Sequence, residues 1–122
     1  MAISIVRLGS PRARDEGLRI GTVRRPPRGV RKADHAKRDY YDVWLPELAP
    51  STKLIKTALA DWQRFAKLYR QEMRKRERLL EVLARLSRDS NFAVGCYCED
   101  EGRCHRSILR QILIEHGARI AV

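Results

Sequence analysis

The sequence predicts an α/β fold, as a single domain over residues 1–122 with three α/β/α layers and a mostly parallel sheet. Three observations support this prediction. Apolar residues nearly alternate in two short segments near the N-terminus, they recur at three- and four-residue spacing in the middle, and the last third has a strand, helix, strand order. The length of 122 residues suits one ordinary domain with one core.

Two strands are expected in the N-terminal part, over residues 3–8 and 18–23, because apolar and polar residues nearly alternate there. Turn residues fill the connection at 9–17. Consecutive prolines exclude regular structure from a basic loop at 24–32. Residues 40–45 are rich in strand formers and predict a short strand.

Helices are expected in the middle of the chain. Ser51 is a suitable N-cap for a short helix that ends at about Leu59. A longer helix is predicted over about 61–88, because apolar residues recur along it at helical spacing, with a gap around Arg76. The remaining residues of this helix are densely charged, which indicates a solvated face.

The last third predicts an ordered strand-helix-strand unit. Residues 92–98 have the composition of a buried strand, 107–116 form an amphipathic helix that Gly117 ends, and 118–122 form a final strand. Short connections of this kind require parallel strands joined by a crossover. The sheet is therefore expected to be at least partly parallel, with helices on its faces.

Composition and charge limit the possible functions. The chain has 26 Lys and Arg against 15 Asp and Glu, a formal charge of +11, which favours an anionic small molecule or nucleic acid as partner. No apolar run reaches the roughly 18 residues of a membrane helix, and no signal-peptide pattern is present, so no membrane partner is expected. The 3 cysteines cannot build a disulfide framework and indicate a reducing cytoplasm.

The segment 96–107 carries the candidate chemistry. It joins the end of a predicted strand to the start of a helix, where open α/β sheets place their ligand sites. There the Cys104 thiol would meet free amides and the positive end of the helix dipole, which stabilise a thiolate, while Arg103, His105 and Arg106 add positive charge. We therefore expect Cys104, His105 and Arg106 to form an anion-binding site for a phosphorylated or nucleic-acid-derived ligand, with the thiol as candidate nucleophile.

Two features of this segment limit that hypothesis. Three consecutive acids at 99–101 must point away from a bound anion or serve as acid and base groups. The spacing also differs from the Cys-x5-Arg loop of cysteine phosphatases, because six residues separate Cys96 from Arg103 and four separate Cys98 from it.

Other roles for the cysteines stay open. Cys96, Cys98 and Cys104 can bind zinc with His105, or act in redox chemistry, or simply pack as small apolar side chains. The spacing is unlike that of usual structural zinc sites, and the adjacent Cys104 and His105 are expected to leave the helix start in different directions. No cofactor is therefore expected.

A nucleic-acid-binding module without enzymatic activity is the alternative function. In this hypothesis Arg24, Arg25, Arg31 and Lys32 of the basic loop 24–38 contact phosphates, and neighbouring aromatic side chains stack on bases. The competing interpretation is that the aromatic residues pack in the core and the arginines only make the protein soluble.

Several short motifs, in order, resemble a known family. They include Ile3-Ser-Ile-Val-Arg-Leu8, Val23-Arg-Arg-Pro-Pro-Arg-Gly-Val30, Trp44-Leu-Pro-Glu-Leu-Ala-Pro-Ser51 and Cys104-His-Arg-Ser107. Together with motifs between them they cover nearly the whole chain, and they are similar to the YeaO-like proteins, the family called domain of unknown function 488. The resemblance implies a three-layer α/β fold of bacterial or archaeal cytoplasmic type, and no settled activity.

The same resemblance adds candidate residues outside the cysteine segment. The recurring polar positions of the family fall on Arg7, Arg28, Cys104, His105, Arg106 and Ser107. The anion site is therefore expected to include Arg7, Arg28, Arg103 and Ser107. The chain departs from the family at 24–27, where Arg-Arg-Pro-Pro replaces a segment with an acid, so this loop is purely cationic. We expect the Arg28 loop and the Cys104 loop to meet at one edge of the sheet.

Overall fold

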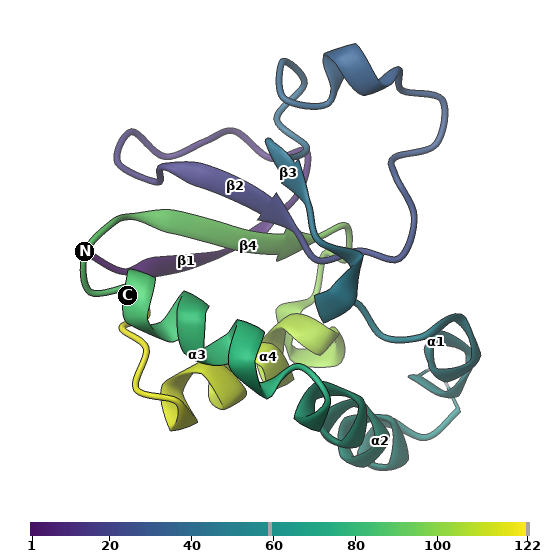
Figure 1. The fold of residues 1–122 in the computed structure, drawn as a ribbon. Coiled ribbons are helices and arrows are strands. Elements are labelled where there is room, and N and C mark those ends of the chain that lie inside the picture. Colours follow the sequence, from purple (N-terminus) through teal and green to yellow (C-terminus); the bar gives the residue numbers. More distant parts are fainter. Residues whose placement is uncertain (59, 122) are drawn as a thin grey trace.

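A parallel sheet forms one layer of the protein (Figure 1). The computed structural model describes residues 1–58 and 60–121. Within these residues the strands are β1 (Ile3–Arg7), β2 (Leu18–Gly21), β3 (Val43–Trp44) and β4 (Phe92–Cys96), in the order β1-β4-β2-β3. Every neighbouring pair is parallel, which confirms the predicted α/β class and parallel sheet.

Strand β4 is the centre of the sheet. Ile3 of β1 and Leu18 of β2 both lie opposite Phe92, so β4 has a partner on each edge. All five of its residues are buried. A strand that is covered on both faces and both edges needs the continuous apolar run that predicted it.

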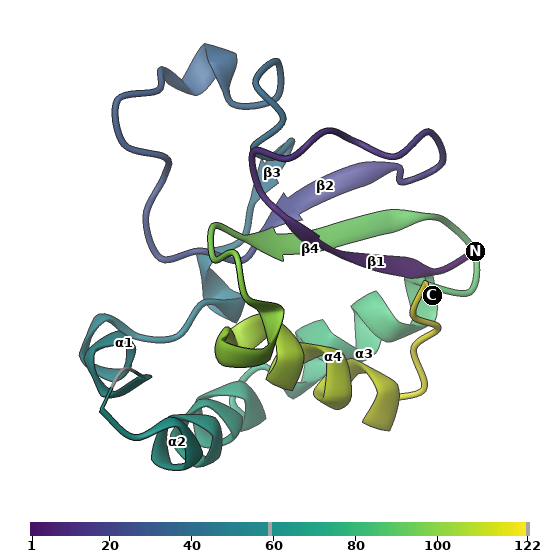
Figure 2. The same ribbon diagram turned by 180° about the vertical axis from the view of Figure 1, so that it is seen from behind.

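The helices lie together on one side of the sheet (Figures 1 and 2). They are α1 (Thr52–Ala58), α2 (Trp62–Arg74), α3 (Glu77–Leu86) and α4 (His105–Glu115). Ile20 and Val94 of the sheet belong to the same apolar core as Tyr69 and Leu109 of the helices. The predicted end of the first helix, Leu59, lies outside the described residues. None of the described helices is long and apolar enough to cross a membrane.

The opposite face of the sheet is covered by loops, which form the third layer in place of helices. Tyr41 lies directly on Gly21, because a Cβ atom at position 21 would be 2.3 Å from the tyrosine ring. Arg19 is fully buried on this side, where it donates hydrogen bonds to the Glu16 carboxylate and to the backbone oxygen of Asp39. Arg19 therefore lies in the protein interior, although its neighbour Ile20 points to the opposite face of β2.

The single long helix predicted over 61–88 is wrong, because the helix is broken between α2 and α3. The backbone amide of Lys75 ends α2 with bonds to the carbonyl oxygens of Glu72 and Met73, and Arg76 leaves helical geometry with φ −112° and ψ 19°. The break coincides with the gap in the apolar pattern around Arg76. It allows two separate helices to pack against α4.

The predicted final strand over 118–122 is also wrong in extent. Within the described residues it is reduced to one parallel bridge between Ile120 and Ile3, and residue 122 lies outside them. Gly117 adopts φ +88° and ends α4, and the following Ala118 amide still bonds to the Leu113 carbonyl oxygen at 2.9 Å. The first residue of the expected strand is therefore used to cap the helix.

Candidate functional site

Three cysteines converge where β4 ends and α4 begins. Cys96 is the last residue of β4, and Cys104 is the N-cap of α4, where its sulfur accepts a hydrogen bond from the Arg106 amide. The two buried thiols are hydrogen-bonded, with 2.8 Å between their sulfur atoms. Cys98 lies in the connection between them and is the exposed member of the group.

The three thiols differ in acidity because of these contacts. Hydrogen bonds with the Cys104 and Cys96 thiols, together with the positive charge of Arg106, lower the pKa of Cys98 to about 2. The pKa of Cys96 is raised, because its thiol donates to Cys104 and Cys98 and is buried. At Cys104 the hydrogen bond from Cys96 lowers the pKa, but donation to Cys98 and burial outweigh it and the pKa is raised. These shifts favour the thiolate at Cys98, whereas the helix start alone predicts it at Cys104.

His105 is held as a neutral imidazole beside this cluster. Its Nε2 lies 2.8 Å from the carbonyl oxygen of Thr22, which can only accept, so Nε2 carries the proton. Its Nδ1 lies 3.7 Å from the Cys104 sulfur. Burial lowers the pKa of His105 to about 4. The two side chains predicted to diverge thus point toward one another, and the Nδ1 lone pair faces the thiols.

Arg106 is a buried cation next to the exposed thiol. Only 3% of the residue is exposed, and one guanidinium nitrogen donates to the backbone oxygen of Cys98. Its Nε has no hydrogen-bond partner, and none of the described carboxylates forms an ion pair with it. A buried charge requires a compensating charge. The positive charge of Arg106 in turn lowers the pKa of Cys98 and favours a thiolate there.

The thiols open into a cavity of about 610 Å³ between the sheet edge and α1. Cys96, Cys98, Cys104 and His105 line one part of it. The wall opposite is apolar, and includes Ile55 and Phe65. Cationic side chains complete the lining, namely Arg24, Arg25, Arg28, Lys56 and Arg103. We call this space the thiol cavity.

The predicted anion-binding residues are divided between this cavity and other positions. Arg28 and Arg103 line the thiol cavity, so the Arg28 loop and the Cys104 loop do meet. Arg7 instead lines a neighbouring cavity, where its side chain bonds to the Tyr97 carbonyl oxygen and to Glu99. The Ser107 hydroxyl donates to the Cys104 carbonyl oxygen at 3.0 Å and is not part of the lining.

The three acids of the segment are used outside the thiol cavity. Glu99 pairs with Arg7 at 3.4 Å, and the Asp100 side chain accepts the Gly102 amide at 2.9 Å. Glu101 forms a two-pronged ion pair with Arg110. None of the three lines the thiol cavity. The local charge next to Cys98 is therefore positive, although the loop sequence is mixed.

The cationic residues of the basic loop have different surroundings. Arg24 and Arg25 line the thiol cavity, and Arg24 also bonds to the carbonyl oxygens of Ala49 and Pro50. Arg31 pairs with Asp34, and neither it nor Lys32 belongs to the lining. The four residues of the predicted nucleic-acid surface thus separate into two pairs.

Cys96, Cys104 and His105 are also the residues that can hold a metal ion. One ligand atom from each lies within 4.8 Å of the others, and all three residues are buried. A histidine ligand commonly donates its second nitrogen to a carbonyl oxygen, as His105 does to Thr22. Soft thiolates together with imidazole suit zinc.

Sequence reasoning overlooked three contributors to the site. The sequence predicts Cys98 as a metal ligand, a redox residue or a packing residue, and its spacing from Cys104 does not predict that the two thiols influence each other's pKa. Lys56 of α1 lies far away in the chain, and Tyr97, which also lines the cavity, reads as a strand residue. Only the folded connection between β4 and α4 brings these groups together.

A parallel α/β domain with a cysteine, histidine and arginine cluster at the carboxyl edge of its sheet is the class that fold and site define. The chain belongs to the family described as the active DUF488-N3 subclade, whose model matches residues 3–117. This match confirms the resemblance to domain of unknown function 488. Comparisons with curated proteins and with solved structures find no match.

Proposed function

We propose that the protein binds a phosphorylated or nucleic-acid-derived ligand in the thiol cavity and acts on it through the Cys98 thiolate. The observation that carries this proposal is the composition of the cavity, which combines an exposed thiol with a cationic lining. The side chains of Arg28 and Arg103 have no hydrogen-bond or ion-pair partner among the described residues, so their planar donor groups are available to an anion.

The charges around Cys98 serve both binding and reactivity. A low-pKa thiolate is the nucleophilic form of cysteine, and nearby cations stabilise it. An anionic ligand that approaches the thiolate would be repelled unless arginines neutralise it. The cationic lining supplies this neutralisation, while the buried Arg106 stabilises the thiolate itself.

Cys104 and His105 act as positioning residues in this proposal. The Cys104 thiol donates toward Cys98, and its own sulfur is fixed by the Arg106 amide at 3.5 Å. His105 is fixed in one tautomer by Thr22 and presents an acceptor to the same sulfur. A reducing cytoplasm would keep the three thiols unoxidised.

Selective alkylation tests the proposal. Protein is treated with less than one equivalent of iodoacetamide at about pH 6, where an ordinary thiol is mostly protonated. Cys98 should be alkylated before Cys96 and Cys104, as mass spectrometry of peptides would show. Inorganic phosphate should slow the reaction, and Arg28→Gln should weaken that protection. Alkylation of Cys98 at the rate of free cysteine, or a rate indifferent to phosphate, would contradict the proposal.

Zinc binding is a second candidate function, favoured by the orientation of His105. Its Nδ1 lone pair and the sulfurs of Cys96 and Cys104 form a three-ligand set, with a fourth position open to Cys98 or a ligand. The two sulfurs lie 2.8 Å apart and must separate to bind one zinc ion at a Zn–S distance of about 2.3 Å. Stoichiometric zinc in purified protein, lost in Cys104→Ser, would support this function. Its absence from protein prepared with added zinc would exclude it.

A further inference from the structure

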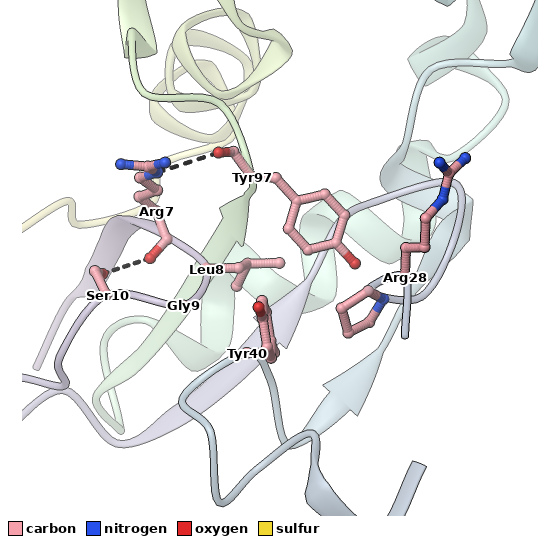
Figure 3. A pocket seen from close by; sticks show the side chains of 8 residues that line it. Arg7, Leu8, Gly9, Ser10, Arg28, Tyr40 and Tyr97 are labelled. Carbon is pink, nitrogen blue, oxygen red and sulfur yellow. Dashed lines mark hydrogen bonds between the residues drawn. The ribbon is translucent and has the colours of Figure 1, made fainter. Parts of the chain in front are cut away.

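A second cavity, of about 460 Å³, is shown in Figure 3. Its walls are the aromatic rings of Tyr40 and Tyr97 with the side chain of Leu8. Figure 3 shows the Tyr97 ring between Arg7 on one side and Arg28 on the other. We call this space the tyrosine cavity.

The two cavities share side chains. Tyr97 and Arg28 line both of them, so the tyrosine cavity and the thiol cavity adjoin at these two residues. A ligand bound with its anionic group at Arg28 has the Cys98 thiol on one side and the tyrosine rings on the other. The ligand of the thiol cavity can therefore extend into the tyrosine cavity.

We propose that the tyrosine cavity holds the base of a nucleotide, stacked on Tyr97, whose phosphate is bound at Arg28 in the thiol cavity. This inference rests on the proposed function and names its substrate class, a nucleotide unit. Every base has a flat π-face that stacks on an aromatic side chain, and arginine forks onto phosphate. The volume is within the range of pockets for ligands of this size.

Tyr97 is fixed in the orientation that stacking requires. Its hydroxyl donates to the Arg25 carbonyl oxygen at 2.9 Å, which anchors the ring tip to the loop that carries Arg28. The Tyr40 and Tyr97 rings are nearly perpendicular, at an interplanar angle of 76° with 6.2 Å between centroids, so the two rings do not stack on one another. The guanidinium of Arg38 covers the Tyr40 ring at 5.9 Å. Tyr97 is thus the ring that has a face for a base.

The turn beside the tyrosine cavity requires glycine at position 9. Gly9 adopts φ +93°, and a Cβ atom there would lie 3.2 Å from the Tyr40 ring. Any other residue would therefore be strained and would push Tyr40 into the space. Next to this turn, Arg7 is held by the Tyr97 carbonyl oxygen and by Glu99, and it bounds the end of the cavity opposite Arg28.

Three probes of increasing size separate the base site from the phosphate site. Inorganic phosphate, ribose 5-phosphate and adenosine monophosphate are titrated by calorimetry against wild type and Tyr97→Leu. The adenosine nucleotide should bind wild type more tightly than ribose 5-phosphate does, and Tyr97→Leu should lose roughly 5- to 150-fold of that affinity. Binding of the two smaller probes should stay the same. Tyr97→Phe keeps the ring but loses the hydroxyl bond to Arg25, and should retain most of the nucleotide affinity. Selective alkylation of Cys98 in the variants shows that the site is still folded.

The outcomes distinguish this inference from the proposed function. Equal affinity of wild type for the nucleotide and for ribose 5-phosphate would overturn the base site and leave the anion site intact. Failure of all three probes to bind would overturn the anion site as well. Trp44→Leu removes an exposed aromatic side chain outside both cavities and should change nothing. Titration with a single-stranded tetranucleotide shows whether the natural ligand is a nucleic acid or a free nucleotide. Tighter and strongly salt-dependent binding than that of the mononucleotide indicates nucleic acid. Equal affinity for the two indicates a free nucleotide.

Discussion

Cys98 acquires its acidity from two thiols that are separated by eight residues in the chain, Cys96 and Cys104. The free amide of the helix start is satisfied by Cys104, which accepts from Arg106 and turns its sulfur inward. The Cys104 thiol therefore lowers the pKa of Cys98, and the negative charge is favoured on Cys98 and not on the residue at the helix start. An exposed thiolate supported by buried donors can react while its supports cannot.

Removing the Cys104 thiol should raise the pKa of Cys98 toward its ordinary value of about 8.5, because the largest stabilising hydrogen bond is lost. The measurement is the pH dependence of Cys98 alkylation in Cys104→Ala. The wild-type rate should be nearly flat between about pH 5 and 8, whereas the variant rate should rise about tenfold per pH unit. Ser107→Ala, which touches the Cys104 carbonyl but not its sulfur, is the control. A flat profile in Cys104→Ala would refute the dependence.

His105 should make the fold sensitive to acid. Burial lowers its pKa to about 4 from 6.5, so between these values the unfolded chain binds a proton that the native protein does not. Stability is therefore lost as pH falls through this interval, by up to about 3 kcal/mol. Urea unfolding of wild type and His105→Gln across the interval measures the effect. The variant should lack this part of the slope, and equal slopes would show that His105 contributes nothing to it.

Strand β2 lies where the sequence predicts it, but the burial of its residue Arg19 was not predicted. Arg19 is buried under the loop layer together with Glu16, which bonds to it at 2.7 and 2.9 Å. Two backbone oxygens, of Ser10 and Asp39, complete the donors of the guanidinium. The loops that cover this face of the sheet are therefore joined by one ion pair.

Glu16→Ala should destabilise the protein by roughly 3–5 kcal/mol, because it leaves the Arg19 charge buried without its partner. Denaturant unfolding measures this loss. Arg31→Ala breaks an ion pair in which the arginine side chain is 85% exposed, and should cost at most about 1 kcal/mol. Similar losses in the two variants would mean that the buried pair does not hold the loop layer.

The order and type of the elements follow from the sequence, but their ends and their covered faces do not. Alternation located β1 and β2, and the continuous apolar run located β4. The same alternation does not predict that Arg19 is buried, because it contains no information about a partner such as Glu16 in a loop. The gap at Arg76 marked the end of α2, yet apolar periodicity alone cannot separate a gap from a break. Residues 118–121 read as a strand because capping of α4 by Ala118 depends on the turn at Gly117.

The net charge of +11 is a property of the whole molecule, but the site uses only part of it. The parallel topology places the ends of β2 and β4 at one edge, and this brings the Arg28 loop beside the cysteines, as the sequence predicted. The sequence could not predict which charged side chains line the thiol cavity. The acids 99–101 do not line it, Lys56 of α1 does, and Arg31 forms an ion pair with Asp34 outside it. This distribution of charged side chains depends on the direction in which each side chain points, which the sequence pattern does not reveal.

The cationic side chains that line the thiol cavity should accelerate the reaction of Cys98 with an anionic reagent by more than the net charge of the protein explains. Iodoacetate carries a negative charge and iodoacetamide is neutral, so the ratio of their alkylation rates at Cys98 reports the local potential. The ratio should exceed that for free cysteine by about tenfold or more at low salt, and should fall as salt screens the field. Arg28→Gln should reduce the ratio severalfold. Arg31→Gln makes the same change in net charge outside the cavity and should leave it close to wild type. If both variants reduce the ratio equally, the effect belongs to the overall charge and not to the arginines beside the thiol.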